Sequence, residues 1–391
     1  MTPPLRDALE RACIPDAEGA QARAWAALSE AHATRVPRPS RSRSRRRWSP
    51  RVGIVALAVL VLAAAVAVAA EPPRWVRQVL DGTAAHRRSS LGPLPAGRLL
   101  VSSARGTWIV GADGTRTRVG PWTDATWSPR GLYVAAWRGR ELSAVAPDGR
   151  VAWTVAVPGV LRDVRWSPDG YRIAYRHDHA LAVIAGDGTA PRVLASPVRA
   201  VAPAWRPGEP HTLAWVDARG RVAVADVDVG IPVWGSAAPV GRDVRELLWS
   251  ADGRRLIARG PSRLVVLDVR DNRDWRMWVP RSAGFDAAAW APHGARLALA
   301  MRVGTATRLD VLGPAGAAGE AMAPRRSVLT VPGTLASLAW SPDGRTLVVR
   351  RREADQWLLV PADGRGRPTA IGGVSRRFGG VPTVRGWCCA G

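Results

Sequence analysis

One short motif recurs along the chain and constrains the fold more than any other feature. It consists of an alternating apolar segment, a Trp and a Ser-Pro-Asp-Gly turn, and it is clearest at residues 166–170 and 340–344. Variants begin at four further positions: Trp127, Trp205, Trp249 and Trp290. Successive motif tryptophans are 39, 39, 44, 41 and 50 residues apart. A period of about 40 to 50 residues is typical of one four-stranded blade of a β-propeller.

The repeat near Arg162 shows how four strands can be read from one period. Its first strand ends at Trp166, and Pro168 and Gly170 supply backbone angles that reverse the chain. Alternation of apolar residues predicts three further strands, over residues 171–176, 180–185 and 192–195. An Asp-Gly pair before the last strand predicts a hairpin turn, and this pair recurs in three other repeats. These turns, and the lack of a helical apolar period between them, exclude helical repeats of similar length.

The number of blades follows from the six motif copies and one more at the C-terminus. Trp387 is preceded by an alternating segment and followed by Gly391 at the motif spacing. Residues 97–120 contain the later strands of a blade but no Trp-led first strand. We therefore predict an all-β, seven-bladed propeller over residues 97–391, in which the C-terminal strand completes the first blade and removes the open sheet edges. Six-bladed and eight-bladed rings remain alternatives.

The motif tryptophans are predicted to lie in the core. A large ring at the end of a strand can fill the space between two blades that pack face to face, and burying it contributes on the order of 3 kcal/mol. We therefore interpret these rings as packing groups and not as ligand-stacking groups. The repeated Asp169, Asp252 and Asp343 are interpreted as turn residues and not as paired catalytic acids.

A second strong signal lies before the repeats, where residues 52–70 contain no charged or polar side chain. As a helix, these 19 residues would be roughly 28 Å long, which matches the hydrocarbon thickness of a bilayer. Eight arginines and no acid lie between residues 35 and 51, so the positive-inside rule places the N-terminus in the cytoplasm and the repeats outside. Because 51 residues are too many for the n-region of a cleaved signal peptide, we predict an uncleaved signal anchor.

These signals divide the chain into five segments. In chain order they are a short helical cytoplasmic segment (1–34), an Arg-rich juxtamembrane linker (35–51), a transmembrane helix (52–70), an extracytoplasmic linker (71–96) and the β-propeller (97–391). The first partner that they imply is the lipid bilayer, through residues 52–70. The chain is therefore expected to be a single-pass protein of the cell membrane.

The net charge of +24 does not by itself indicate a nucleic acid partner. All 56 basic residues are Arg, and Ala, Gly, Pro and Val are frequent, which is the composition expected of a GC-rich bacterial genome. We therefore interpret the charge mainly as a solvated basic surface, with an anionic partner as the alternative. The Arg-rich run beside the predicted span is explained by topology, so nucleic acid is not expected as a partner.

No residues suggest a catalytic centre, a cofactor site or a metal site. The Gly-x-Ser-x-Gly, Walker and dinucleotide fingerprints are absent. The one local cluster, His177, Asp178 and His179, falls between two predicted strands and is interpreted as a solvated turn, with a metal or acid–base site as the alternative. The three cysteines lack zinc spacing, and we expect no disulfide between the adjacent Cys388 and Cys389, because that geometry is strained.

The Trp-Ser-Pro-Asp-Gly repeats resemble those of TolB-type β-propellers, which are built from WD-like repeats. The resemblance covers residues 97–391, about three quarters of the chain, and it implies the fold. It does not imply the role of TolB in outer-membrane maintenance, because a predicted basic tail and anchor replace the N-terminal domain of TolB. The order of tail, anchor and propeller is also similar to that of membrane-bound regulators of transcription factors in high-GC Gram-positive bacteria.

The sequence favours a binding protein over an enzyme. We expect a non-catalytic scaffold that binds a protein or another ligand on a propeller face. In a finer form of this hypothesis, the propeller senses an external ligand and the cytoplasmic tail docks a regulator such as a sigma factor. The alternative is a propeller enzyme of lyase or glycosidase type, which requires carboxylates or histidines from different blades to converge at the channel mouth. Binding of anionic envelope polymers by the basic surface is a third hypothesis.

Overall fold

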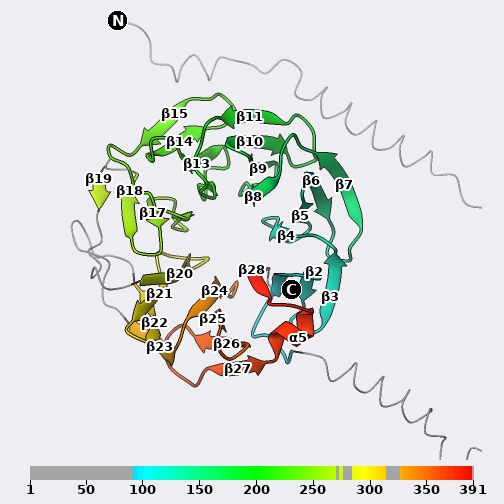
Figure 1. The fold of residues 1–391 in the computed structure, drawn as a ribbon, viewed down its shortest axis with the longest axis vertical. Helices are drawn as coiled ribbons and strands as arrows, with labels where there is room; N and C mark the ends of the chain where they lie inside the picture. Colours follow the sequence, from blue (N-terminus) through cyan, green and yellow to red (C-terminus); the bar gives the residue numbers. More distant parts are fainter. Residues whose placement is uncertain (1–90, 270–272, 276–283, 314–325, 390–391) are drawn as a thin grey trace, which may run out of the picture. The chain divides into compact units, whose positions relative to one another are not determined.

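Seven four-stranded antiparallel sheets form a ring in the computed structural model of this protein (Figure 1). The structure describes residues 91–269, 273–275, 284–313 and 326–389, all of which lie within one compact unit, Val79–Gly391. The only helix in these residues is the short α5 (Val374–Phe378). The predicted all-β, seven-bladed propeller is therefore confirmed.

We number the blades along the chain and name the innermost strand of each first. Blade 1 contains β28 (Thr383–Cys388), β1 (Arg98–Ser103), β2 (Gly106–Val110) and β3 (Arg116–Gly120). Blade 2 contains β4 (Asp124–Trp127), β5 (Val134–Arg138), β6 (Glu141–Val145) and β7 (Val151–Ala156). Blade 3 contains β8 (Leu161–Trp166), β9 (Arg172–His177), β10 (Ala180–Ala185) and β11 (Arg192–Ala195). Its last two strands have the predicted bounds.

The remaining blades follow the same plan. Blade 4 contains β12 (Ala204–Trp205), β13 (Thr212–Val216), β14 (Val222–Asp226) and β15 (Pro232–Gly235). Blade 5 contains β16 (Glu246–Trp249), β17 (Arg255–Arg259), β18 (Leu264–Asp268) and β19 (Arg273–Trp275). Blade 6 contains β20 (Gly284–Trp290), β21 (Leu297–Val303), β22 (Ala306–Leu312) and β23 (Arg326–Pro332). Blade 7 contains β24 (Leu335–Trp340), β25 (Thr346–Arg351), β26 (Gln356–Pro361) and β27 (Thr369–Gly372).

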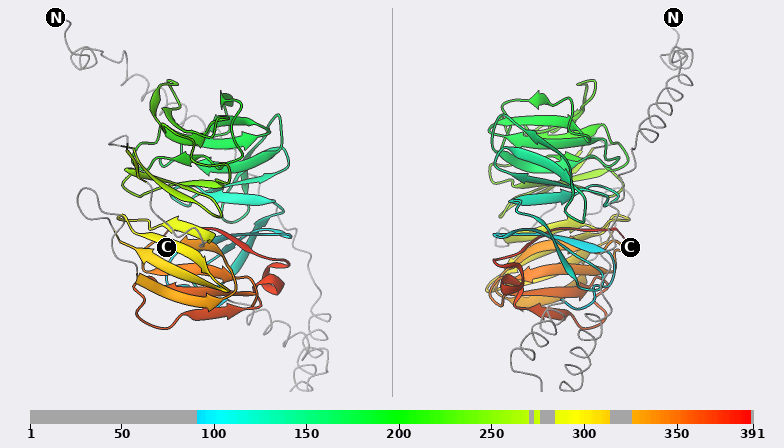
Figure 2. Two further views of the ribbon diagram at one scale, coloured as in Figure 1. Left: turned by 60° about the vertical axis from the view of Figure 1, so that its left-hand side comes forward. Right: turned by 90° about the vertical axis from the view of Figure 1, so that its right-hand side faces the viewer.

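The C-terminal strand closes the ring. β28 pairs antiparallel with β1, with Leu99 opposite Trp387 and Val101 opposite Val384. Figure 2 shows this red strand beside the cyan strands at the start of the propeller. The prediction that the C-terminal strand completes blade 1 is confirmed. Blade 1 is thus built from strands near opposite ends of the described residues, so the ring cannot open without breaking this pairing.

Two details near this closure differ from expectation. Leu91 and Leu94, which were assigned to the linker, are buried, and their backbone N–H groups donate to carbonyls of the turn after β2. The packed structure therefore begins before residue 97. The prediction of no disulfide was wrong, because Cys388 and Cys389 are bonded to each other. Neighbouring residues of a strand normally point to opposite faces, but Cys389 has a φ of 54°, which interrupts that alternation.

The predicted segments 1–34, 35–51 and 52–70, and most of the linker 71–96, lie outside the described residues. Among the residues that are described, no helix is long and apolar enough to cross a bilayer. The anchor and its orientation therefore stay predictions.

Seven apolar clusters join the described blades, one between each pair of neighbours around the ring. Between blades 2 and 3, for example, Trp137 and Leu142 pack with Ile173 and Tyr175. Residues 134–137 of β5 are all buried, because both faces of a blade are covered by its neighbours. No blade could bury both faces alone, so the blades depend on one another for their stability.

The Ser and Asp of the motif build its turn, and for the Asp this role was predicted. The Ser167 hydroxyl donates to Asp169 (2.5 Å) and accepts from the backbone N–H of Arg172 (2.9 Å), while Asp169 accepts from the backbone N–H of Tyr171 (3.0 Å). Equivalent bonds occur in the turns of blades 5 and 7. These serines are fully buried, and their hydroxyls replace backbone partners that the turn would otherwise lack.

The motif tryptophans link the innermost strands through a series of hydrogen bonds. In each link, the indole N–H donates to the carbonyl of the residue just before the Trp of the preceding blade. The four links are Trp205 to Arg165 (3.0 Å), Trp249 to Ala204 (3.0 Å), Trp290 to Leu248 (3.1 Å) and Trp340 to Ala289 (2.9 Å). In contrast, the indole nitrogens of Trp127 and Trp166 are buried with no acceptor among the described residues. The series is therefore interrupted at blades 2 and 3.

At three joints, an arginine of the preceding blade also holds the tryptophan. Its guanidinium lies over the ring and donates to the carbonyl of the turn glycine that follows. The three sets are Arg98 with Trp127 and Gly131, Arg206 with Trp249 and Gly253, and Arg296 with Trp340 and Gly344. The cation-to-centroid distances are 5.1, 5.3 and 5.0 Å, within the range of cation–π attraction.

The prediction that the motif tryptophans form core applies to only some of them. Trp205, Trp249, Trp340 and Trp387 are buried. Trp127, Trp166 and Trp290 are half-buried and, together with the buried Trp205 and Trp249, line a cavity of about 460 Å³ beside the motif turns. These three rings are therefore packing groups that also form part of a surface.

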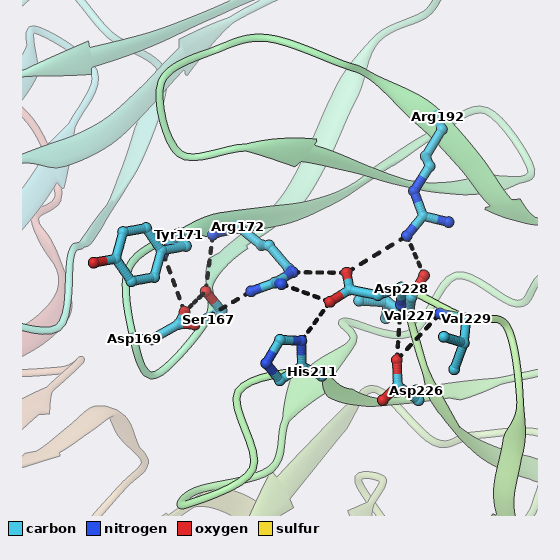
Figure 3. A network of polar contacts seen from close by, with 10 residues as sticks. All are labelled: Ser167, Asp169, Tyr171, Arg172, Arg192, His211, Asp226, Val227, Asp228 and Val229. Atoms are coloured by element: carbon cyan, nitrogen blue, oxygen red, sulfur yellow. Dashed lines mark hydrogen bonds and ion pairs between the residues drawn. The ribbon is translucent and has the colours of Figure 1, made fainter. Parts of the chain in front are cut away.

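A polar network ties blades 3 and 4 together at their periphery (Figure 3). Nε and Nη2 of Arg172 donate to the two carboxylate oxygens of Asp228, at 2.9 and 2.6 Å, and His211 contacts the same carboxylate. The hydrogen bond from Arg172 lowers the pKa of Asp228. This ion pair adds a bidentate polar contact to a joint that lies next to the interruption of the indole series.

We predict that Trp249→Phe lowers the free energy of unfolding by about 1–2 kcal/mol more than Trp166→Phe. The first substitution leaves the Ala204 carbonyl without its donor and weakens the contact with Arg206. The second removes a buried N–H that has no acceptor. Urea denaturation of the full-length protein in detergent measures both. Equal losses would contradict a stabilising role for the indole bonds.

Candidate functional site

The innermost strands surround a central channel, and four of them are irregular. The pairing registers show extra residues in β8 at Asp163 and Val164, in β20 at Asp286, in β24 at Ser337 and Leu338, and in β28 at Arg385. Such β-bulges turn a side chain out of the regular alternation and are frequent next to functional sites. Asp163 and Ser337 also have positive φ angles of 54° and 55°. Polar side chains can therefore leave the blade faces, which are apolar, and enter the channel.

A cavity of about 370 Å³ lies in this channel and is lined by residues of six blades. Its charged residues, which we call the charged belt, are three carboxylates and three guanidinium groups: Asp124, Glu246, Asp286, Arg165, Arg259 and Arg385. The belt draws on blades 1, 2, 3, 5 and 6. Charges of both signs are thus brought together from parts of the sequence that are far apart.

Each carboxylate of the charged belt is paired with an arginine. Arg385 contacts Asp124 at 2.6 Å, Arg302 contacts Asp286 at 2.9 Å, and Arg259 contacts Glu246. Nearby, Arg176 donates twice to a single oxygen of Asp163, at 2.9 and 2.6 Å. The guanidinium of Arg165 donates to the backbone carbonyl of Val164, at 2.9 Å, and forms no ion pair among the described residues. Because Asp286 pairs with Arg302, which is not a belt residue, Arg165 is left as the belt arginine without an ion pair.

The pair of Asp124 and Arg385 is the most strongly perturbed part of the belt. Burial raises the pKa of Asp124, although Arg385, the backbone N–H of Ala125 and the Ser102 hydroxyl oppose this shift. Burial lowers the pKa of Arg385, against the attraction of Asp124. Water still reaches 37% of the Arg385 side chain. The two groups are thus partly buried but remain accessible from the channel, as is common for residues of ligand-binding sites.

The predicted polar cluster between β9 and β10 is divided by the structure. Asp178 and His179 lie in the turn, as expected, and Asp178 has a φ of 48°. His177 is instead the last residue of β9 and is only 8% exposed. Its Nδ1 atom lies 3.8 Å from the Asp178 carboxylate. Within the described residues there is no group of three or more His, Cys, Asp or Glu side chains that could hold a metal ion.

The charged belt was missed by the sequence analysis, although a signal was present. Asp124 and Glu246 both stand three residues before a motif tryptophan, as do the channel residue Ser337 and Asp163 of the β8 bulge. In blades 3 and 7 the apolar residues before that tryptophan are spaced by three and then by two, as in Leu335, Leu338 and Trp340. This break in alternation marks the bulge.

Comparisons with known proteins identify the fold alone. No protein-family model and no curated protein matches this sequence. The structure is similar to the β-propeller domain of Cps50 (Swd1) from Myceliophteria thermophila, with a TM-score of 0.51 and 14% identity over 64% of this chain and 86% of that chain. It is also similar to a putative 6-phosphogluconolactonase from Bacteroides uniformis, with a TM-score of 0.52 and 15% identity over 71% and 95%. Identities this low carry no function across.

We predict that Arg385→Ala destabilises the full-length protein in detergent by about 1–2 kcal/mol at neutral pH, because it leaves Asp124 buried and unpaired. The folded-state pKa of Asp124 already lies above the ordinary 3.8, so the folded state binds this proton more tightly than the unfolded state. The loss should therefore shrink as the pH falls through that raised pKa. Urea denaturation at several pH values measures it.

The double variant Asp124→Asn/Arg385→Ala is the control. It removes the titrating group, so its difference from Asp124→Asn should not change with pH. If the loss of unfolding free energy in the single variant Arg385→Ala did not change with pH, Asp124 would be solvated in the channel and the prediction would be wrong.

Proposed function

We propose that this chain is a non-catalytic binding protein whose ligand or protein partner engages the central channel of the propeller. The observation that carries the proposal is the charged belt, in which side chains of opposite sign from five blades surround one accessible cavity. Propellers commonly bind along their axis, where loops and inner strands of many blades converge. A belt of this kind offers a polar partner several charge-assisted hydrogen bonds at once.

The ion pairs favour binding over catalysis. A general acid or base must exchange a proton with its substrate, and it needs a geometry that leaves one oxygen free to do so. In the belt, Asp124 accepts hydrogen bonds from Ser102 and Ala125 and pairs with Arg385, all through Oδ1, so its Oδ2 takes no part in these contacts. Asp286 pairs with Arg302 and accepts from Thr307 and the backbone of Leu335. Both oxygens of Asp286 are thus engaged, and each of the two carboxylates holds an arginine in place. Oδ2 of Asp124 is the oxygen on which the enzyme alternative depends.

A propeller enzyme of lyase or glycosidase type is the second candidate. Two observations favour it: carboxylates of blades 2, 5 and 6 converge on the same cavity, and burial raises the pKa of Asp124. The expectation for this alternative was that carboxylates or histidines from different blades meet at the channel. The name of the structurally similar putative lactonase adds little, because its identity with this chain is 15%.

Site-specific photocrosslinking in the native cells tests the proposal. A photoreactive residue in place of Thr126, which lines the channel cavity, should give a discrete adduct. The matched control is Leu132, which lies in the turn of the same blade and is 62% exposed; it should give none. Absence of a Thr126 adduct would contradict binding in the channel.

The enzyme alternative is tested by turnover. The full-length protein is incubated with chromogenic glycosides and with acidic polysaccharides, and product release is measured. We expect no release above that of the buffer. Turnover that disappears in Asp124→Asn or Glu246→Gln, in protein of unchanged melting temperature, would establish catalysis instead.

We further propose that the propeller is extracytoplasmic and anchored by residues 52–70. An alkaline phosphatase reporter fused after Gly391 should therefore be active, whereas a reporter fused after residue 34 should be inactive. Replacing the eight arginines between residues 35 and 51 with Gln should reduce the activity of the first fusion, because the orientation signal is lost. Activity of the residue-34 fusion alone would reverse the proposed topology.

In its finer form, the proposal makes the chain a sensor whose segment 1–51 docks a cytoplasmic regulator such as a sigma factor. It is supported by the order of tail, predicted anchor and propeller, which resembles that of membrane-bound regulators. Affinity purification on residues 1–51 tests it, and recovery of no specific partner would count against it.

A further inference from the structure

A second cavity, which we call the seam pocket, lies where the ring is closed. It has a volume of about 710 Å³, within the range of small-molecule sites. Its walls come from the β1–β2 turn, the connection from β3 to β4, and the segment that leads into β28. It therefore opens at the start of the inner strands, opposite the motif turns. Thr383 and Arg385 line both the seam pocket and the channel cavity, so the two adjoin.

The seam pocket is strongly basic. Four of its lining residues are arginines, namely Arg105, Arg118, Arg138 and Arg385, and none is acidic. The nearest counter-charges are already engaged: Asp124 pairs with Arg385, and Glu141 lies 3.9 Å from Arg138. Arg105 and Arg118 have no acidic partner among the described residues, so their like charges repel each other, and an anion placed between them relieves this repulsion.

Two of these arginines are available to a ligand. The Arg105 guanidinium makes no hydrogen bond or ion pair with any described residue, and Arg105 is exposed at the tip of the β1–β2 turn. Arg118 donates to the backbone carbonyl of Arg105, at 2.8 Å, and its guanidinium lies 6.0 Å from the ring centroid of Trp108. This contact positions one cation beside the other, and both retain unused donors.

Two tryptophans, Trp108 and Trp122, also line the seam pocket. The Trp108 indole donates to the Ser103 hydroxyl (3.3 Å), which in turn donates to the carbonyl of Phe378 (2.9 Å). Trp122 lies against Gly120, where a Cβ atom would come within 2.4 Å of the indole nitrogen. Both rings are half-buried. They can present flat apolar surfaces to a ligand at little cost in side-chain entropy.

From this combination we infer that the seam pocket binds a small anion that joins a phosphate or carboxylate group to a ring or apolar portion. The anionic group would receive the donors of Arg105 and Arg118, whose planar forks suit both phosphate and carboxylate. The ring or apolar portion would pack on Trp108 and Trp122. The inference goes beyond the proposed function, because it concerns a separate cavity and holds whether the channel binds a partner or catalyses a reaction.

Isothermal titration calorimetry on the full-length protein in detergent tests the inference, with phenyl phosphate, benzoate and inorganic phosphate as probes. We expect saturable binding of at least one ring-bearing probe, tenfold or more tighter than that of inorganic phosphate. Arg105→Ala and Arg118→Ala should each weaken it at least tenfold. Because both arginines are exposed, neither substitution should change the melting temperature appreciably.

Arg219→Ala is the matched control, because Arg219 is exposed in the β13–β14 turn, the counterpart of the Arg105 turn in blade 4. It should leave the binding unchanged. The inference is overturned if none of the three probes binds, or if Arg219→Ala weakens binding as much as Arg105→Ala does. In the second case the attraction would arise from the basic surface as a whole.

Discussion

The structure depends on the packing of each blade against its two neighbours at the level of the innermost strands. Blade faces are apolar on both sides, so no blade is stable until both are covered. The motif tryptophan sets the geometry of the joint, because its ring packs between two blades. Where an acceptor is present, its N–H donates to a carbonyl of the preceding inner strand, as Trp249 does. At three joints an arginine guanidinium also lies over the ring. Repetition of this joint, followed by the pairing of β28 with β1, determines the size of the ring.

Features that arise from local chemistry could be predicted from the sequence. The Ser-Pro-Asp-Gly turn satisfies its own backbone groups within about six residues, so its position survives in any tertiary context. The bounds of β10 and β11 followed from alternation and an Asp-Gly turn. The closing role of the C-terminal strand followed from two facts: residues 97–120 lack a Trp-led first strand, and the C-terminal end of the chain has one Trp-led strand with no blade of its own. Each of these inferences needs only spacing and residue type.

The charged belt could not be predicted in the same way, because it depends on departures from strand regularity. Asp286 and Arg385 are the extra residues of the bulges in β20 and β28, where strict alternation does not give the direction of a side chain. Which carboxylate meets which arginine depends on contacts between blades, as for Arg385 of blade 1 and Asp124 of blade 2. The disulfide was missed for a related reason, since one left-handed residue at the end of β28 places neighbouring side chains together.

The closure is the one joint that the repeat cannot specify. Trp387 donates to Ala96, at 2.5 Å, instead of to blade 7, and Trp127 and Trp166 on the other side lack acceptors. Helix α5 and the segment after it are inserted here before β28. Because the motif does not constrain this joint, its residues are free to serve other purposes. The seam pocket and the most perturbed ion pair of the channel, Asp124 with Arg385, both lie here. In this ring of similar blades, the seam pocket and the Asp124–Arg385 pair thus lie where the repeat pattern ends.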